Sequence, residues 1–236
     1  MVIDYFQLLR RFLKLKILSI TTSSSVCSVC ILDHNNIIKK LSLNNEKTHS
    51  ENLMPLISTL FNETHLSLDD IDYIACDIGP GSFTGIRIGI SSVKAMAEAK
   101  SIKIIPVNSL EALAYNVVSK KYICSLIDAK NNNVYFGLFD HRYNLIQNLD
   151  ADNIDPILNR LPNEEIVFVG NGAEMHKERI INKFKNGQFC NNNLLSSSKL
   201  GICAYNKILK SEYVTADTLL PLYLRKSQAE RMLDNG

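Results

Sequence analysis

Several features that would mark a special class of protein are scarce or absent in this chain of 236 residues. It has no tryptophan, and no uninterrupted apolar run is long enough to cross a bilayer, so we expect no membrane span. It also lacks an excess of either charge, since 26 basic and 24 acidic residues give a net charge of +2. The first sixteen residues hold four of the basic residues and one acid, which leaves 22 basic and 23 acidic residues in the body. A body so balanced does not have the basic surface of an autonomous nucleic-acid binder.

The six cysteines do not form the pattern of a zinc site or a disulfide framework. Cys27 and Cys30 have the Cys-x-x-Cys spacing, but they lie in a β-like run, where residues three apart face opposite sides of the strand. The sequence has no second pair, whereas zinc needs four convergent ligands. Without a segment that resembles a secretory leader, we expect reduced thiols, a cytoplasmic location and no metal site.

The amino-terminal segment 1–15 has two interpretations. Phe6, Leu9, Phe12 and Leu13 would share one face of a short basic helix, which is typical of an anchor at a membrane surface. The alternative, which we favour, is an upstream extension or a misassigned start codon, because the apolar stretch is too broken for a signal peptide. Residues 1–15 are therefore left out of the fold argument.

The remaining sequence predicts an α/β protein of two similar lobes. Residues 17–32 and 37–43 have the composition of three short strands, and Thr48 and Glu51 form a capping box at the start of a helix. A strand at 71–77 and a helix at 85–99 complete a βββαβα unit. Strands at 121–128, 134–139 and 165–169, with helices at 173–185 and 200–211, repeat the plan. We place the lobes at 16–107 and 108–236, each with a mixed sheet flanked by helices.

A glycine-rich turn joins the strand at 71–77 to its helix. Gly79, Gly81 and Gly85 allow the backbone to reverse sharply, and Ser82 or Thr84 is a suitable helix cap. A helix start in this position can bind an anion or nucleotide through its unpaired N–H groups. The alternative, which the sequence leaves open, is that the glycines only allow the helix to pack tightly against the sheet.

The run Ile78-Gly-Pro-Gly-Ser-Phe-Thr-Gly-Ile-Arg-Ile-Gly resembles the signature of the TsaB family. Four further segments extend the resemblance over nearly the full chain: Ile20-Thr-Thr-Ser, His49-Ser-Glu-Asn-Leu-Met-Pro-Leu-Ile, Ile127-Asp-Ala-Lys-Asn-Asn-Asn-Val-Tyr and Leu220-Pro-Leu-Tyr-Leu-Arg-Lys-Ser-Gln-Ala. The resemblance implies an actin-like ATPase (ASKHA) fold. It further implies a cytoplasmic, non-catalytic subunit of the machinery that makes threonylcarbamoyladenosine (t6A) beside the anticodon of tRNAs that read ANN codons.

Departures from relatives of this fold support a role without catalysis. Thr21 stands where relatives carry an aspartate that organises metal and phosphates, and a hydroxyl cannot replace a hard anionic ligand of magnesium. In the catalytic paralogue TsaD, a His-x-x-x-His pair holds a metal where this chain has Ser109 and Leu113. His49 is not expected to be catalytic, because no acid or nucleophile lies within motif distance. We therefore expect no cofactor on this chain alone, with ATP or ADP only at the interface of a complex.

The resemblance also implies partners. These are a TsaD-like catalytic subunit in a heterodimer and a TsaE-like ATPase, with tRNA bound only through the complex; whether the isolated chain pairs with itself stays open. The family's subunits meet through the helices at 51–61 and 85–99, both of which are apolar over much of their circumference. The predicted interface residues are Leu53, Met54, Ile57, Phe61, Arg87, Ile90, Val93 and Met96.

Two alternatives remain at this point. In the first, both helices are fully buried within the chain and have no outward apolar face. Helices that cover a sheet often bury two sides in this way. A different class of function, a metal-dependent peptidase or a small-molecule kinase of the same fold, is the alternative to a non-catalytic subunit. The positions of Thr21 and Ser109 in the fold bear on this choice.

Overall fold

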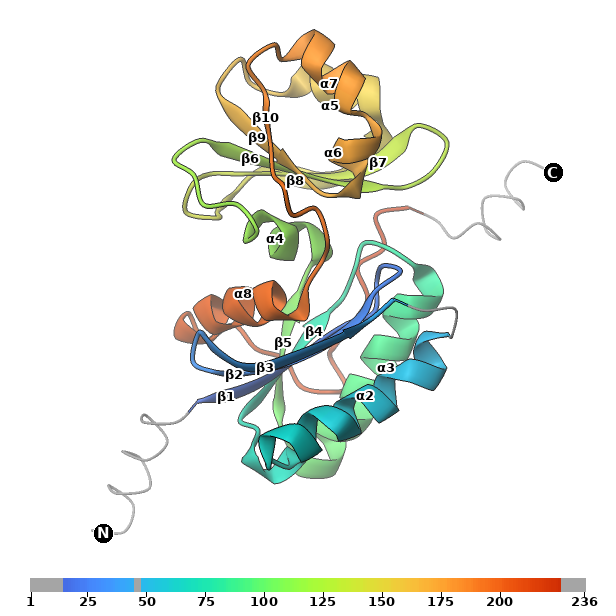
Figure 1. The fold of residues 1–236 in the computed structure, drawn as a ribbon, viewed down its shortest axis with the longest axis vertical. Coiled ribbons are helices and arrows are strands. Elements are labelled where there is room, and N and C mark those ends of the chain that lie inside the picture. Colours follow the sequence, from blue (N-terminus) through green and yellow to red (C-terminus); the bar gives the residue numbers. More distant parts are fainter. Residues whose placement is uncertain (1–14, 45–47, 226–236) are drawn as a thin grey trace, which may run out of the picture.

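The computed structural model describes residues 15–44 and 48–225, so nearly all of the predicted extension lies outside the described residues. The chain forms two five-stranded sheets, one in each lobe, and helices α4 and α8 lie between them (Figure 1). The predicted α/β class and the division into two lobes with mixed sheets are confirmed.

The first sheet has the strand order β3-β2-β1-β4-β5. Its strands are β1 (Lys16–Thr21), β2 (Cys27–Asp33), β3 (Asn36–Leu43), β4 (Tyr73–Asp77) and β5 (Lys103–Val107). The first three strands form the predicted antiparallel meander, and β4 and β5 continue the sheet in parallel with β1. Every described strand of the predicted first βββαβα unit is therefore present.

Helices α2 (His49–Thr64) and α3 (Phe83–Lys100) cover one face of this sheet, and a short 3-10 turn, η1 (Leu68–Asp70), precedes β4. The predicted capping box is present at the start of α2, where the Glu51 carboxylate accepts from the Thr48 N–H at 2.9 Å. Successive side chains along each strand face opposite sides of the sheet. Leu18 and Ile20 of β1 therefore pack under these two helices, and Ile17 packs on the opposite side.

The opposite face of the first sheet is covered by α8 (Ser197–Leu209), and α4 (Ser109–Ala114) packs between α8 and the second sheet. Leu200 and Cys203 of α8 are fully buried against Ile17 and Leu32, and the Ser19 hydroxyl donates to the Ser197 carbonyl. The predicted assignment of all residues from 108 to 236 to the second lobe is therefore wrong for α8. The chain returns to the first lobe because this face of the sheet carries apolar side chains, which α8 buries.

The second sheet has the order β10-β9-β6-β7-β8. Its strands are β6 (Tyr122–Asp128), β7 (Asn133–Phe139), β8 (Leu145–Asn153), β9 (Ile166–Val169) and β10 (Gln188–Phe189), and its helices are α5 (Ile154–Arg160), α6 (Asn171–Met175) and α7 (Lys177–Lys183). The predicted single helix at 173–185 is wrong, since two short helices meet at His176. Strands β8 and β10 and helix α5 were not predicted.

After α8 the chain runs back along the first lobe in a segment that we call the strap, residues 212–225. Val214 pairs with Ile104 of β5 through two backbone hydrogen bonds of 2.9 and 2.8 Å. Leu219 is 1% exposed and belongs to the core under α2 and α3, and the Leu222 N–H donates to the Ile78 carbonyl at 2.8 Å. The strap is thus an integral part of the first lobe.

Candidate functional site

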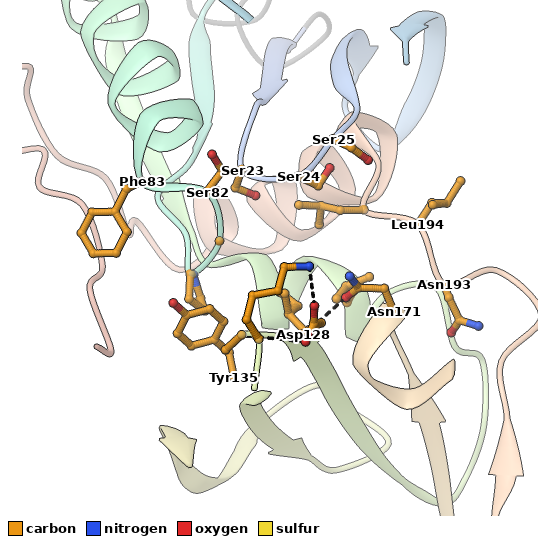
Figure 2. Close-up of a pocket in the computed structure, with 17 residues that line it drawn as sticks. Ser23, Ser24, Ser25, Ser82, Phe83, Asp128, Tyr135, Asn171, Asn193 and Leu194 are labelled. Atoms are coloured by element: carbon orange, nitrogen blue, oxygen red, sulfur yellow. Dashed lines mark hydrogen bonds and ion pairs between the residues drawn. The ribbon is translucent and has the colours of Figure 1, made fainter. Parts of the chain in front are cut away.

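A cavity of about 640 Å³ lies where the two lobes face each other (Figure 2). The first lobe contributes the turn between β1 and β2 and the start of α3, and the second lobe contributes the turn between β6 and β7 and the start of α6. The residues that line it are Ser23, Ser24, Ser25, Pro80, Gly81, Ser82, Phe83, Leu113, Ile127, Asp128, Ala129, Lys130, Tyr135, Asn171, Asn193, Leu194 and Leu195.

The glycine-rich turn packs directly against the turn between β1 and β2. A Cβ atom on Gly85 would lie 1.9 Å from the Thr22 carbonyl oxygen, and one on Gly81 would lie 2.2 Å from the Ser23 carbonyl oxygen. The Ser82 N–H donates to that same Ser23 oxygen at 2.7 Å. These glycines are required for close approach, which supports the packing interpretation that the sequence left open.

Of the five residues predicted to bind an anion or nucleotide, only Gly81 and Ser82 line the cavity. The Ser82 hydroxyl caps α3 by accepting from the Gly85 N–H at 3.2 Å. Gly79 has a φ of +94°, which favours glycine, while Thr84 is exposed. The structure therefore brings two of the five to the cavity and gives the others roles in the turn and the helix.

A buried carboxylate, Asp77 at the end of β4, organises the wall behind the cavity. It accepts hydrogen bonds from the hydroxyls of Thr21 at 2.6 Å, Ser23 at 2.5 Å and Ser109 at 2.6 Å, and from the Gly79 N–H at 3.0 Å. Burial raises the pKa of Asp77, and the four donors oppose that rise by favouring the ionised form. Sequence reasoning had flagged Thr21 and Ser109 but not the carboxylate that holds them.

The raised pKa of Asp77 gives a testable pH dependence. A carboxyl whose pKa is higher in the folded state than in the unfolded state contributes stability that is present below its unfolded value, about 3.9, and is lost as pH rises through the folded value. We expect the free energy of unfolding of Asp77→Asn to change less than that of the unsubstituted protein as the pH is raised from about 4 to about 8. Urea denaturation at several pH values measures this, and parallel curves for the two proteins would contradict it.

The turn between β6 and β7 forms the opposite wall. Lys130, Asn131 and Asn132 have φ values of +66°, +54° and +60°, so three successive residues are left-handed. The family resemblance placed Asn132 at a glycine position, and asparagine tolerates this conformation better than most residues. The Asp128 carboxylate, 3% exposed, accepts from the Lys130 N–H and pairs with its ammonium group, both at 2.9 Å. The turn is therefore held by hydrogen bonds and an ion pair within itself.

His49, which was considered as a candidate catalytic residue, contacts the turn between β1 and β2. Its Nε2 lies 2.7 Å from the Ser24 carbonyl oxygen, so this nitrogen carries the hydrogen that is donated. His49 is not among the residues that line the cavity. The contact fixes the start of α2 to a cavity-lining turn, which is a structural role.

The predicted interface residues separate into two groups. Leu53 and Ile57 of α2 and Ile90, Val93 and Met96 of α3 are buried in the core of the first lobe, so the prediction that they face outward is wrong. The helices lie side by side on the sheet, and each buries one side against the sheet and another against its neighbour. Met54 is 51% exposed, Arg87 is exposed and Phe61 is partly buried. These three are the predicted residues that remain accessible at the surface of α2 and α3.

Two properties of residues 15–44 and 48–225 concern metals and membranes. Within this part of the chain no three His, Cys, Asp or Glu side chains converge as metal ligands would. None of its helices combines the length and the apolar character needed to cross a bilayer.

A family model described as TsaD, tRNA N6-adenosine threonylcarbamoyltransferase, matches residues 37–232. The match covers the first lobe from β3 onward, the second lobe, α8 and the strap. The chain belongs to this family. Its curated relatives include the protein named tRNA threonylcarbamoyladenosine biosynthesis protein TsaB of Bacillus subtilis, which is 29% identical over 222 residues, or 91% of this chain and 96% of that protein.

Solved structures agree with this assignment. A crystal structure of a Pseudomonas aeruginosa protein, described as having similarity to peptidase YeaZ, has a TM-score of 0.77 and 25% identity, and covers 89% of this chain and all of that one. A ROK family protein of Streptococcus pneumoniae has a TM-score of 0.51 at 9% identity over 84% of this chain and 99% of that one, and shows the fold alone. The actin-like ATPase fold and the predicted resemblance to TsaB proteins are confirmed.

Proposed function

We propose that this chain is a cytoplasmic, non-catalytic subunit of the machinery that makes t6A in tRNA. In this proposal it binds and organises a TsaD-like catalytic subunit in a heterodimer, works with a TsaE-like ATPase, and meets tRNA only through the complex. The names of its TsaB relatives and the TsaD family model support the process. The absence of catalysis on this chain rests on the chemistry of its own residues.

The observation that carries the proposal is the Asp77 network. Relatives of this fold place metal-organising groups at the positions of Thr21 and Ser109, but here both side chains are short hydroxyls that donate to one buried carboxylate. A hydroxyl held in this way has its hydrogen directed away from any ligand in the cavity, and it offers no negative charge to a divalent cation. The residues at the positions where relatives of this fold organise metal and phosphates thus bond to one another and have a structural role.

The description of the Pseudomonas aeruginosa structure suggests a peptidase. The residues of this chain support that activity less well. Serine nucleophiles need an adjacent base. Ser23 donates its hydroxyl hydrogen to Asp77 and lies 3.1 Å from the Ser109 hydroxyl, and no histidine is among the residues that line the cavity. The buried carboxylate is already shared among three hydroxyls and one N–H, so it is poorly placed to activate any one of them.

Co-purification tests the proposal directly. The catalytic paralogue from the same genome, carrying an affinity tag, is expected to retain this chain in a stoichiometric complex through size-exclusion chromatography. Each protein alone is expected to give no t6A on unmodified tRNA in the presence of ATP, threonine and bicarbonate with the remaining enzymes of the pathway, while the mixture gives product. Full activity of the catalytic paralogue without this chain would overturn the proposal.

We also expect the isolated chain to lack a functional nucleotide site. The Ser82 hydroxyl accepts from the Gly85 N–H in the first turn of α3, and the turn at Thr22 and Ser23 packs against Gly81 and Gly85. Calorimetric titration of ATP with magnesium into the pure chain should show no saturation up to about 1 mM, a limit that corresponds to a binding free energy of about −4 kcal/mol. Turnover of ATP by the pure chain would restore the kinase alternative.

A further inference from the structure

Chain connections and polar contacts hold the two lobes together on the side of α4 and α8. The chain crosses between lobes at α4 and again before α8, and the Asn116 amide adds hydrogen bonds of 3.1 and 3.0 Å to the carbonyls of Asn192 and Leu194. Lys207 of α8 and Glu111 of α4 also form an ion pair on this side at 3.2 Å. We call this side of the molecule the hinge.

The strap makes a further contact between the lobes, at the cavity itself. Arg225, at the last described position of the strap, donates from Nη1 to the Ala129 carbonyl at 3.0 Å. Ala129 lines the cavity and begins the turn between β6 and β7, whereas the strap up to Leu222 is bonded to the first lobe. A hydrogen bond from a charged guanidinium is among the stronger kinds, and its acceptor here belongs to a turn that is bonded within itself.

The position of Arg225 is set by the start of α3. Tyr223 stacks on Phe83 with ring centroids 4.5 Å apart and ring planes 8° apart, and its hydroxyl accepts from Arg87 Nε at 3.0 Å. Phe83 is the first residue of α3 and also lines the cavity. The stack fixes the strap two residues before Arg225, so a shift of α3 would be passed to the arginine.

We propose that the strap is a latch: Arg225, positioned by the stack of Tyr223 on Phe83, holds the β6–β7 turn of the second lobe against the first lobe and sets the opening of the cavity. Release of the Arg225 contact allows the second lobe to rotate about the hinge. The inference depends on contacts within the chain and holds whether or not the chain binds a catalytic partner.

Pulsed electron paramagnetic resonance on the full chain tests the latch. Spin labels at Ser58→Cys on α2 and Glu178→Cys on α7, both exposed, report on the two lobes, because these helices lie at opposite ends of the molecule (Figure 1). Cys190→Ser removes the native cysteine that is not buried. Arg225→Ala is expected to shift the mean distance and broaden its distribution, and to raise amide exchange in residues 129–133 by about tenfold, the factor that corresponds to one lost charge-assisted hydrogen bond.

Arg142→Ala is the matched control, because it removes one positive charge from an exposed position on the second lobe. If Arg225→Ala does not fold, Arg225→Gln serves instead, since its side chain is too short to reach the Ala129 carbonyl. A folded Arg225 variant with an unchanged distance distribution and unchanged exchange would overturn the latch. An equal change in Arg142→Ala would overturn it as well, because the effect would then come from charge alone.

Discussion

Met54→Asp is expected to abolish formation of the heterodimer with the catalytic paralogue while leaving the fold intact. Met54 lies on α2 and is 51% exposed, so its replacement removes no core packing. In the proposed interface the new carboxylate would be buried without a partner, which costs about 3–5 kcal/mol and corresponds to a loss of affinity of more than 100-fold. Calorimetry or surface plasmon resonance with the pure catalytic subunit measures the dissociation constant.

The chain offers a matched control for this variant. Met175 on α6 is 61% exposed in the other lobe, so Met175→Asp makes the same chemical change away from α2 and α3. Both variants should keep the melting temperature of the unsubstituted protein, and Met175→Asp should keep its affinity. The interface assignment is wrong if Met54→Asp binds as tightly as Met175→Asp.

Gly85→Ala is expected to lower the free energy of unfolding by about 3 kcal/mol, the upper part of the range for overpacking. The added Cβ would lie 1.9 Å from the Thr22 carbonyl oxygen, and this backbone atom cannot move without displacing the turn that lines the cavity. Urea denaturation measures the loss. A Gly85→Ala protein within about 1 kcal/mol of the unsubstituted one would contradict the close approach of the two segments.

Gly89, one helical turn along, provides the comparison. A Cβ there would lie 2.4 Å from the Thr22 hydroxyl oxygen, an atom of a side chain. We expect Thr22→Ala to reduce the effect of Gly89→Ala, which also gains about 1 kcal/mol of helix propensity, but not that of Gly85→Ala. Equal rescue at both positions would show that the Thr22 side chain, and not its backbone, limits the space.

Local pattern was sufficient to predict the sheet of the first lobe and the helices that cover one of its faces. Periodicity identified the strands and both covering helices, and the spacing of Thr48 and Glu51 predicted a cap that the structure contains. Strand β8 was missed because Leu145–Asn153 contains two aspartates and two asparagines, a composition untypical of strands. Its pairing with β7 overrides that preference. The apolar stripe of α8 predicted a buried face but contained no information about which sheet would bury it.

The candidate site was predictable only in part. Thr21 and Ser109 could be singled out from the resemblance, but their shared partner Asp77 lies 56 and 32 residues away, and only the fold shows that they meet. The number of outward-facing apolar residues on α2 and α3 was overestimated. A helix that is apolar on two sides has the same sequence pattern whether its second side meets a partner protein or the neighbouring helix. Arg225 lies in a segment that carries the family resemblance, but its contact could not be predicted, because the acceptor is a backbone carbonyl.

The return of α8 to the first lobe affects how this protein can fold during translation. The face of the first sheet that α8 covers stays uncovered until residues 197–209 leave the ribosome, and the core that includes Leu219 needs later residues still. The second lobe, whose strands all lie between residues 122 and 189, is complete earlier. During translation the second lobe can therefore be completed before the first, and the lobe with the glycine-rich turn lacks part of its core until residues up to 219 have been made.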